Sequence, residues 1–462
     1  MRGGARQVGE DFTQGPLMKQ LMVFATPMIL ASLLQQVYSL VDLAMVGQFV
    51  GSAGTVGVST GGELNDVILP LAQAITAGGQ VYLSQIYGAK KEHLVKKTVG
   101  TLITMCLILA VFCMALQTLG CDIILNLLNC PTEDGAFEQA RNYMLITAIG
   151  IPFVFLYNTM SSMMRSRGES KTPLMSVIVA TVVNIIANYI FLAIIPLEAS
   201  GVAIGTIMSQ IVSAVYCGAY MAKHNDVYGV EFKLSFLTID VEAAKVILSI
   251  GIPQAARSIL VRFSGLWVKA QINSYGLVYS ATNSVGNKLE KFLDVYSNAM
   301  ANAAAAMIGQ NLGAKKYDRA KTVVHDTLLV SSVFAAVVVL ASIFIPRQMF
   351  RIFSTDEEVI SLGVVYLRIM IGQYVLTAIV NAYQSMVVGS GNSKLNFIVG
   401  IFDGIICKIG LGVLFAIILG MGAQGYWWGI SLSRGIPAVI CVAYFYSNKW
   451  QNRELIKEDR PS

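Results

Sequence analysis

The chain has 462 residues, of which 55% are hydrophobic and only 13% are charged, and its mean hydropathy is +0.63. A soluble domain carries roughly a quarter charged residues, so this composition excludes a soluble protein and predicts a membrane protein with little mass outside the bilayer. The formal net charge of +6 does not indicate nucleic-acid binding, because the basic residues are spread over short loops between apolar runs. The seven cysteines lack metal-ligand spacing, and the polar first sixteen residues do not fit a cleaved signal peptide.

Twelve apolar runs are long enough to cross a bilayer, which takes about twenty residues. In chain order they cover 17–49, 58–87, 98–119, 141–163, 174–195, 201–222, 246–273, 281–311, 323–345, 362–388, 395–419 and 423–446. Continuous runs of this length do not fit the shorter, alternating strands of a membrane barrel. We therefore predict an all-α membrane protein with twelve transmembrane helices.

Lysine and arginine in the connecting loops orient these helices, because such residues collect on the cytoplasmic side. With the N-terminus inside, the outside loops hold only Arg141, Arg347 and Arg351, and the other loop lysines and arginines lie inside. Reversing the orientation would invert this strong bias. The pattern predicts a multi-pass protein of the plasma membrane with both termini in the cytoplasm.

The sequence also repeats itself. SQIYGAKK at 84–91 matches GQNLGAKK at 309–316, and Pro27 in ATP matches Pro253 in GIP, each pair separated by about 225 residues. A near-constant separation indicates an internal duplication. With six helices each, the halves have the same orientation and are expected to be related by a pseudo-two-fold axis along the membrane normal. We predict a six-helix bundle at 1–222, a cytoplasmic connecting loop at 223–245, and a second six-helix bundle with a short cytoplasmic tail at 246–462.

Four stretches are distinctive: QQVYSLVDLAMVGQFVG in the first helix, SQIYGA, GQNLGAKK, and FSTDEEVISLGVVYLRI before the tenth helix. Together they resemble the multidrug and toxic compound extrusion (MATE) family, in particular its DinF-like and Clostridia-type branches. The resemblance covers nearly the whole chain. It implies a V-shaped pair of bundles that exports organic cations or drugs in exchange for protons or sodium.

Asp42 is the one charged residue between Leu21 and Gly57. It lies eight residues before the outer end of its helix, and Asn188 and Ser209 lie at similar distances from the outer ends of theirs, with Asn184 one turn deeper. At ~1.5 Å per residue this places all of them at about the same level, ~12 Å below the outer surface. An ionisable group inside a membrane is a functional candidate by default. We predict that these residues form a cation- or proton-coupling site, in which a proton competes with a cation or substrate.

The family resemblance implies the same site, where relatives pair the first-helix aspartate with an Asn-x-x-x-Asp motif in the fifth helix. Here that motif reads Asn184-x-x-x-Asn188, so the second acid is missing. Hard cations favour sites with more ligand charge, so we favour proton coupling and keep sodium at Asp42, Asn184 and Asn188 as the alternative. Interhelical hydrogen bonding is the structural alternative for the asparagines and Ser209.

Three further polar residues match cavity-lining positions of relatives. Gln35 and Tyr38 share the helical face of Asp42, and Asn158 lies in the fourth helix. Helix packing is the alternative role. Pro27 and Pro152 interrupt the first and fourth helices, either as static kinks or as bending points.

The second half is unusual in its embedded charges. Its helices contain Arg257, Arg262, Lys269, Lys288, Lys291, Arg368, Lys408 and Arg434, together with the acids Glu290, Asp294 and Asp403. We assign Arg262, Glu290, Asp294, Asp403, Lys408 and Arg434 to a substrate cavity. Selection of anionic or zwitterionic substrates is one interpretation, and structural ion pairing is the other.

The main functional prediction is a secondary antiporter for drug-like small molecules, acting as a monomer in the lipid bilayer with an ion gradient as its energy source and no cofactor. A flippase or exporter of an anionic or lipid-linked substrate is the alternative. No GxxxxGK[ST] motif is present, so ATP is not expected to drive transport. The three histidines lie in or beside predicted cytoplasmic loops and form no catalytic constellation, so we expect no enzyme activity.

Overall fold

The computed structural model describes residues 9–128, 130–132, 135–230 and 233–456. This described part of the chain is helical apart from turns and loops and contains no strand, which confirms the predicted all-α class. The two chain ends, which the charge pattern assigns to the cytoplasm, lie outside the described residues.

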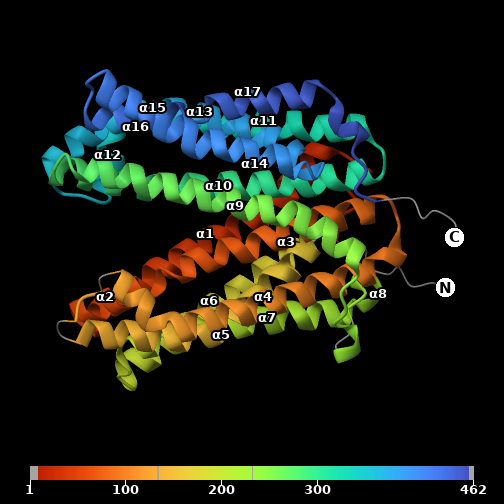
Figure 1. Cartoon of the computed structure of the whole chain (residues 1–462), viewed down its shortest axis with the longest axis horizontal. Helices are drawn as coiled ribbons and strands as arrows, with labels where there is room; N and C mark the ends of the chain where they lie inside the picture. Colours follow the sequence, from red (N-terminus) through yellow and green to blue (C-terminus); the bar gives the residue numbers. More distant parts are fainter. Residues whose placement is uncertain (1–8, 129, 133–134, 231–232, 457–462) are drawn as a thin grey trace. The chain divides into compact units, whose positions relative to one another are not determined.

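All six apolar segments of the first half are helical (Figure 1). The elements are α1 Leu17–Phe49, α2 Gly51–Gly62, α3 Asn65–Gly88, α4 Glu92–Leu127, α5 Ala136–Ser166, α6 Lys171–Tyr189 with a π-helical turn Ile190–Ile194, α7 Glu198–Lys223, and the short α8 Asn225–Tyr228. The predicted second segment is interrupted between Gly62 and Asn65. Hydropathy did not predict this break, because it reports burial and not the course of the backbone.

The six segments of the second half are helical too. They are α9 Val241–Asn273, α10 Leu277–Gly313, α11 Tyr317–Phe344, α12 Pro346–Arg351, α13 Glu357–Gly389, α14 Ser393–Ile401, α15 Gly410–Val413, α16 Ala423–Leu432 and α17 Gly435–Tyr446, with π-helical segments at Phe402–Ile409 and Leu414–Ile418. The eleventh predicted helix is therefore a continuous run of α- and π-helical turns, and the twelfth bends at Ser433 and Arg434.

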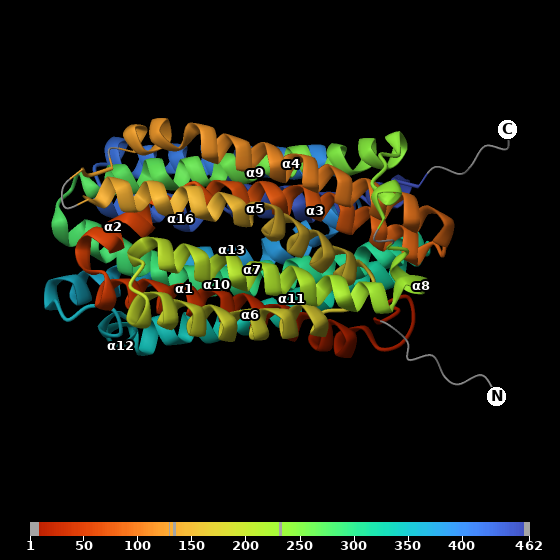
Figure 2. The same cartoon turned by 90° about the horizontal axis from the view of Figure 1, so that it is seen from below.

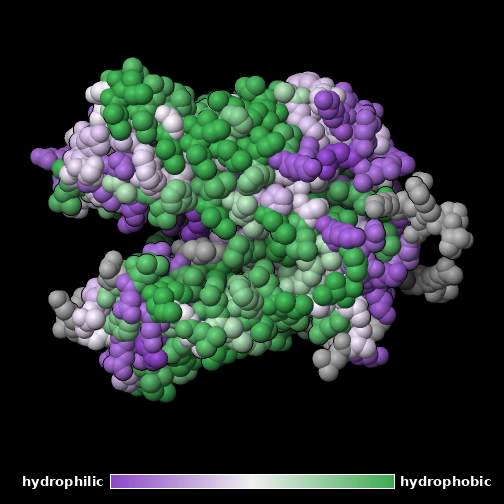
Figure 3. Space-filling view, in the orientation of Figure 1, coloured by the Kyte–Doolittle hydropathy of each residue, from purple (hydrophilic) through white to green (hydrophobic). Residues whose placement is uncertain are grey.

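Length and composition support membrane insertion of these elements. Among the described residues, ten helices are long and apolar enough to cross a membrane. The two remaining segments are the interrupted pair α2–α3 and α10, whose charged residues include Lys288, Glu290 and Asp294. Apolar residues cover the middle of the helices and polar residues gather near their ends (Figure 3). Exposed leucines such as Leu119, 83% exposed, fit contact with lipid.

The chain divides into two compact units, and each is described by itself. The N-unit contains Thr26–Gly251 and the C-unit contains Phe12–Ala25 with the chain from Ile252 onward. In the N-unit, α7 packs along both α5 and α6 (Figures 1 and 2). In the C-unit, α13 packs along α10 and α11.

The N-terminal parts of α1 and α9 are exchanged between the units. The first part of α1, up to Ala25, belongs to the C-unit, and the first part of α9, up to Gly251, belongs to the N-unit. Both changes of unit lie just before the repeat-related prolines Pro27 and Pro253, which sit inside their helices. A proline removes one backbone hydrogen bond and favours a bend at this point of each helix.

Hydrogen bonds hold the segment before α1 in the C-unit. Phe12 is fully buried, and its carbonyl oxygen accepts hydrogen bonds from Asn311 Nδ2 at 3.1 Å and Arg319 Nη2 at 2.9 Å. Arg319 Nη1 donates to the carbonyl of Gly15 at 3.0 Å, and Lys316 Nζ donates to that of Thr13 at 2.9 Å. The loop that carries the GQNLGAKK motif therefore anchors the start of the first helix.

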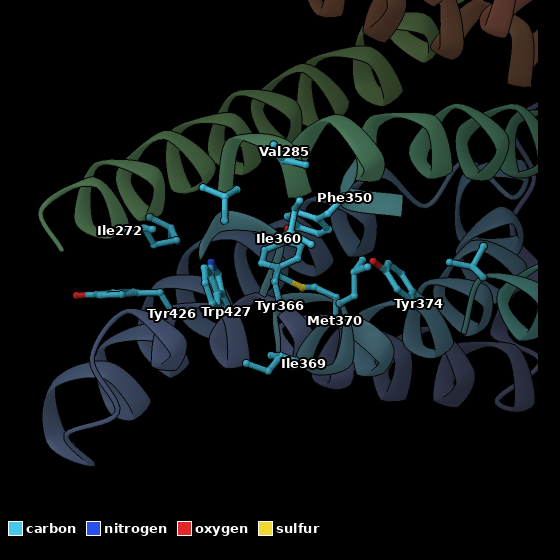
Figure 4. Close-up of a cluster of buried hydrophobic side chains, with 14 of the residues drawn as sticks. Ile272, Val285, Phe350, Ile360, Tyr366, Ile369, Met370, Tyr374, Tyr426 and Trp427 are labelled. Carbon is cyan, nitrogen blue, oxygen red and sulfur yellow. The ribbon is translucent and has the colours of Figure 1, made fainter. Parts of the chain in front are cut away.

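The core of the C-unit is built around Tyr366 and Trp427, both fully buried, with ring centroids 5.1 Å apart in an edge-to-face arrangement (Figure 4). Trp427 Nε1 donates a hydrogen bond to Asn283 Oδ1 at 3.3 Å. Gly286 of α10 makes room for this ring, since a Cβ atom there would lie 2.4 Å from Tyr366. The phenol of Tyr366 is thereby held against α10, where it donates a hydrogen bond to Glu290.

Candidate functional site

The N-unit brings Asp42 of α1 against the C-terminal end of α6. Asn188 Nδ2 donates a hydrogen bond to Asp42 Oδ1 at 2.6 Å. The same amide lies 3.4 Å from Asn184 Oδ1, one helical turn away. Asn184 and Asn188 are buried, while Asp42 is partly exposed. Three of the predicted coupling residues thus form one connected group, in which an amide donor stabilises the charged carboxylate.

The close approach of Asn188 to α7 depends on Gly205. A Cβ atom at Gly205 would lie 2.1 Å from Asn188 Oδ1, so any larger residue would displace the amide. The π-helical turn Ile190–Ile194 begins two residues after Asn188. Sequence reasoning did not identify Gly205, although the pair Gly201 and Gly205 at four-residue spacing is a signal of close helix packing.

A cavity of about 280 Å³ lies beside this group within the N-unit. Its lining includes the predicted residues Gln35, Tyr38, Asn184 and Ser209, and also Tyr157, Thr181, Gln210 and Ser213. Ser209 donates its hydroxyl hydrogen to the carbonyl of Thr206 at 2.7 Å. Asn158 donates to the carbonyl of Val154 at 2.8 Å and does not line this cavity.

Two atoms of the asparagine pair have unused hydrogen-bonding capacity. Asn184 Nδ2 and Asn188 Oδ1 are buried without a hydrogen-bond partner among the described residues. Together with the partly exposed carboxylate of Asp42, they offer one negative charge, one neutral oxygen and one N–H donor. In the described chain, no three His, Cys, Asp or Glu side chains gather as a metal site. The chemistry that this set favours is exchange of a proton or a weakly held monovalent cation at Asp42.

A second group of charges lies in the C-unit. Glu290 and Asp294 lie four residues apart on α10 and line a cavity of about 420 Å³. Arg434 lies 3.8 Å from Asp294 and donates to Thr377 Oγ1 at 2.5 Å. Lys408 lies in the π-helical segment Phe402–Ile409 and is not among the residues that line this cavity. Tyr366, which sequence analysis used only as a landmark of the repeat, is the direct partner of Glu290.

The other predicted cavity residues of the second half lie elsewhere. Asp403 is buried and lies 3.9 Å from Arg257, which also reaches Gln384 Oε1 at 3.5 Å. Gly400 leaves room for Arg257, since a Cβ atom there would lie 2.3 Å from its side chain. Arg262 is exposed on α9 and lines neither cavity.

Comparison with known proteins agrees with this architecture. The MatE family model matches residues 27–190 and again residues 253–414. Two relatives are the probable multidrug resistance protein YoeA of Bacillus subtilis (strain 168), 24% identical with 95% of each chain covered, and the multidrug export protein MepA of Staphylococcus aureus (strain MSSA476), 24% identical with 94% of this chain and 95% of the relative covered.

Solved structures show the same fold. The crystal structure of MATE in the bent conformation superposes with a TM-score of 0.89 at 19% identity, covering 96% of this chain and 97% of the other. An outward-facing structure of a multidrug resistance MATE family transporter of the MOP superfamily gives a TM-score of 0.87 at 18% identity. The match covers 99% of this chain and 100% of the other.

Proposed function

Because the chain belongs to the MATE family of transporters, we propose that it is a secondary antiporter that exports organic cations and amphipathic drugs from the cytoplasm in exchange for protons. MATE proteins are transporters and not enzymes. The observation that supports the proposal is the hydrogen bond from Asn188 to Asp42, because Asn188 also contacts Asn184, which lines a polar cavity. The named activity of the relatives, multidrug export, supports the substrate class.

Proton coupling follows from the balance of charge at Asp42. A charged carboxylate in an apolar segment is costly unless it is paired or wetted, and here one amide donor offsets part of that cost. A proton removes the charge altogether. Sodium would need several oxygen ligands, and Asn188 presents its nitrogen, not its oxygen, to Asp42. We therefore favour the proton, with sodium at Asp42, Asn184 and Asn188 as the competing proposal.

The cavity beside Asp42 suits an amphipathic cation. Tyr38 and Tyr157 supply aromatic surface, and Gln35 and Gln210 supply polar groups. The alternative of an anionic substrate is less favoured, because two of the embedded arginines of the C-unit already have acidic partners. Arg257 lies near Asp403, and Arg434 lies near Asp294. We further propose that the protein works as a monomer without ATP or a cofactor, in the plasma membrane with both termini in the cytoplasm.

The first test measures ethidium efflux from proteoliposomes under separately imposed proton and sodium gradients. Wild-type protein is expected to respond to the proton gradient. Asp42→Asn should reduce this efflux to the level of empty vesicles, because the amide cannot exchange a proton.

Glu63→Gln is the matched control, since Glu63 is an exposed carboxylate between α2 and α3 of the same unit. It should transport like wild type. If efflux responds only to the sodium gradient, the coupling ion is sodium and not the proton. If proton-driven efflux persists in Asp42→Asn, Asp42 is not the coupling residue.

A further inference from the structure

The cavity of the C-unit has an unused hydrogen-bond acceptor. Gln373 lines the cavity, and its Oε1 is buried without a hydrogen-bond partner in the described part of the chain. A buried polar atom that stays unpaired costs free energy, and such an atom at a cavity wall is satisfied when a ligand with a donor binds. The cavity is therefore built to receive a hydrogen-bond donor.

The charges at this cavity indicate a cationic ligand. Glu290 and Asp294 are the two charged side chains among the described lining residues. The acceptors Asn381, Gln373 and Ser331 accompany them. An anion would meet both carboxylates and is disfavoured there.

The walls of the cavity indicate an organic ligand. Tyr296 and Phe334 stack with ring centroids 3.7 Å apart, and both line the cavity with Val338 and Tyr374. Aromatic and aliphatic walls with a few acidic groups suit an amphipathic amine.

Arg434 already supplies a cation to Asp294. Its guanidinium lies 3.8 Å from the Asp294 carboxylate and is held at the cavity by Thr377. The carboxylate of Asp294 therefore already has a positive partner. An entering cationic group gains this carboxylate in full only if Arg434 moves away.

We propose that this cavity binds a positively charged, amino-bearing end of an organic cation and that Arg434 is its tethered competitor. The guanidinium pairs with Asp294 when the cavity is empty, and it leaves when the ligand nitrogen binds between Asp294 and Gln373. The proposal rests on the proposed function, because an exporter of organic cations supplies the ligand. It deepens that function by adding a site in the C-unit and a residue that limits its affinity.

The test is equilibrium binding of ethidium to purified full-length protein in nanodiscs, followed by fluorescence anisotropy at constant ionic strength. Arg434→Gln should bind ethidium about three- to tenfold more tightly than wild type, because the competing cation is gone. Asp294→Asn should bind at least about tenfold more weakly. A purely structural ion pair predicts the opposite sign for Arg434→Gln, since losing it would loosen the cavity.

Two variants separate charge from shape. Arg434→Lys keeps the positive charge and should show no gain in affinity. Arg368→Gln removes one exposed positive charge from α13 of the same unit and should bind like wild type. The gain from Arg434→Gln should vanish in the double variant with Asp294→Asn. An unchanged or weaker affinity of correctly folded Arg434→Gln, or a gain that persists without Asp294, overturns the proposal.

Two further arms separate the alternatives. All variants are repeated with Asp42→Asn, so that a persisting effect of Arg434 reports on the C-unit alone. Replacing potassium by sodium at constant ionic strength tests for a sodium site. A sodium-specific loss of ethidium binding that depends on Asp294 would identify the cavity as a sodium site instead. Proton-driven efflux with no effect of Arg434→Gln on binding refutes this inference alone, whereas absence of both efflux and binding refutes the proposed function too.

Discussion

Gly205 controls the position of the amide that contacts Asp42. Its missing Cβ is the reason that Asn188 Oδ1 can lie directly against α7. Gly205→Ala should push Asn188 away and remove its hydrogen bond to Asp42, which as a bond to a charged group is worth about 1.5–3 kcal/mol. We expect proton-driven efflux to fall by about tenfold or more, measured in the same proteoliposomes.

Gly62→Ala is the matched control for this substitution. Gly62 ends α2, and a Cβ atom there would meet nothing within 4 Å. It should leave efflux unchanged. Full activity of Gly205→Ala would mean that the Asn188 contact is not needed for coupling.

The sequence predicted some of the contacts between single residues and missed others. Counting depth along helices brought Asp42, Asn184 and Asn188 to one level, and the structure places them within one hydrogen-bonded group. The contact between Tyr366 and Glu290 was not foreseen, because depth does not give the rotation of a helix about its axis. Arg262 shows the same limit, since its position near mid-helix leaves it exposed on α9.

At the scale of elements, hydropathy predicted every membrane segment but not the interruptions within them. The breaks after Gly62 and Leu432 and the π-helical turns follow from local backbone hydrogen bonding, which an apolar run does not encode. The two halves nevertheless share some of these local backbone features. The π-helical turns Ile190–Ile194 and Leu414–Ile418 occupy matching positions in the two halves. Lys90 and Lys315 of the repeated GAKK motif share a left-handed backbone, with φ of 55° and 56°.

The loop after α10 anchors the segment before α1, and this contact can be tested directly. Arg319→Ala removes two hydrogen bonds to the carbonyls of Phe12 and Gly15. Each such bond from a charged group contributes about 1.5–3 kcal/mol, so local opening should become at least about tenfold more frequent. Hydrogen–deuterium exchange should therefore rise in peptides that cover residues 12–20.

Lys315→Ala is the control, because Lys315 lies in the same loop with 67% of its side chain exposed. It should leave exchange in residues 12–20 unchanged. Equal exchange in wild type and Arg319→Ala would show that burial of Phe12 alone holds the segment.

At the scale of the whole molecule, the sequence predicted the duplication, and the MatE family model matches the two halves at positions 226 residues apart. The orientation in the membrane remains a prediction from charge alone. It can be tested in intact cells with an impermeant maleimide, since the seven native cysteines are buried. Thr355→Cys, in an outside loop, should react before lysis, and Glu92→Cys, at the inner start of α4, only after lysis.

Each of these variants is the control for the other, because both positions are exposed. Labelling of Glu92→Cys in intact cells, with Thr355→Cys protected, would show that the predicted topology is inverted. The proposed direction of transport would then have to be reversed.

The exchanged ends of α1 and α9 also decide where the gene can be divided. A cut in the loop at 223–240 would leave residues 12–25 on the first fragment, although their partners Asn311 and Arg319 lie on the second. The second fragment would carry residues 241–251, although Ile247 packs against Gly78 of the first. Neither product would be a complete folding unit when expressed by itself, and each would need the other as its complement.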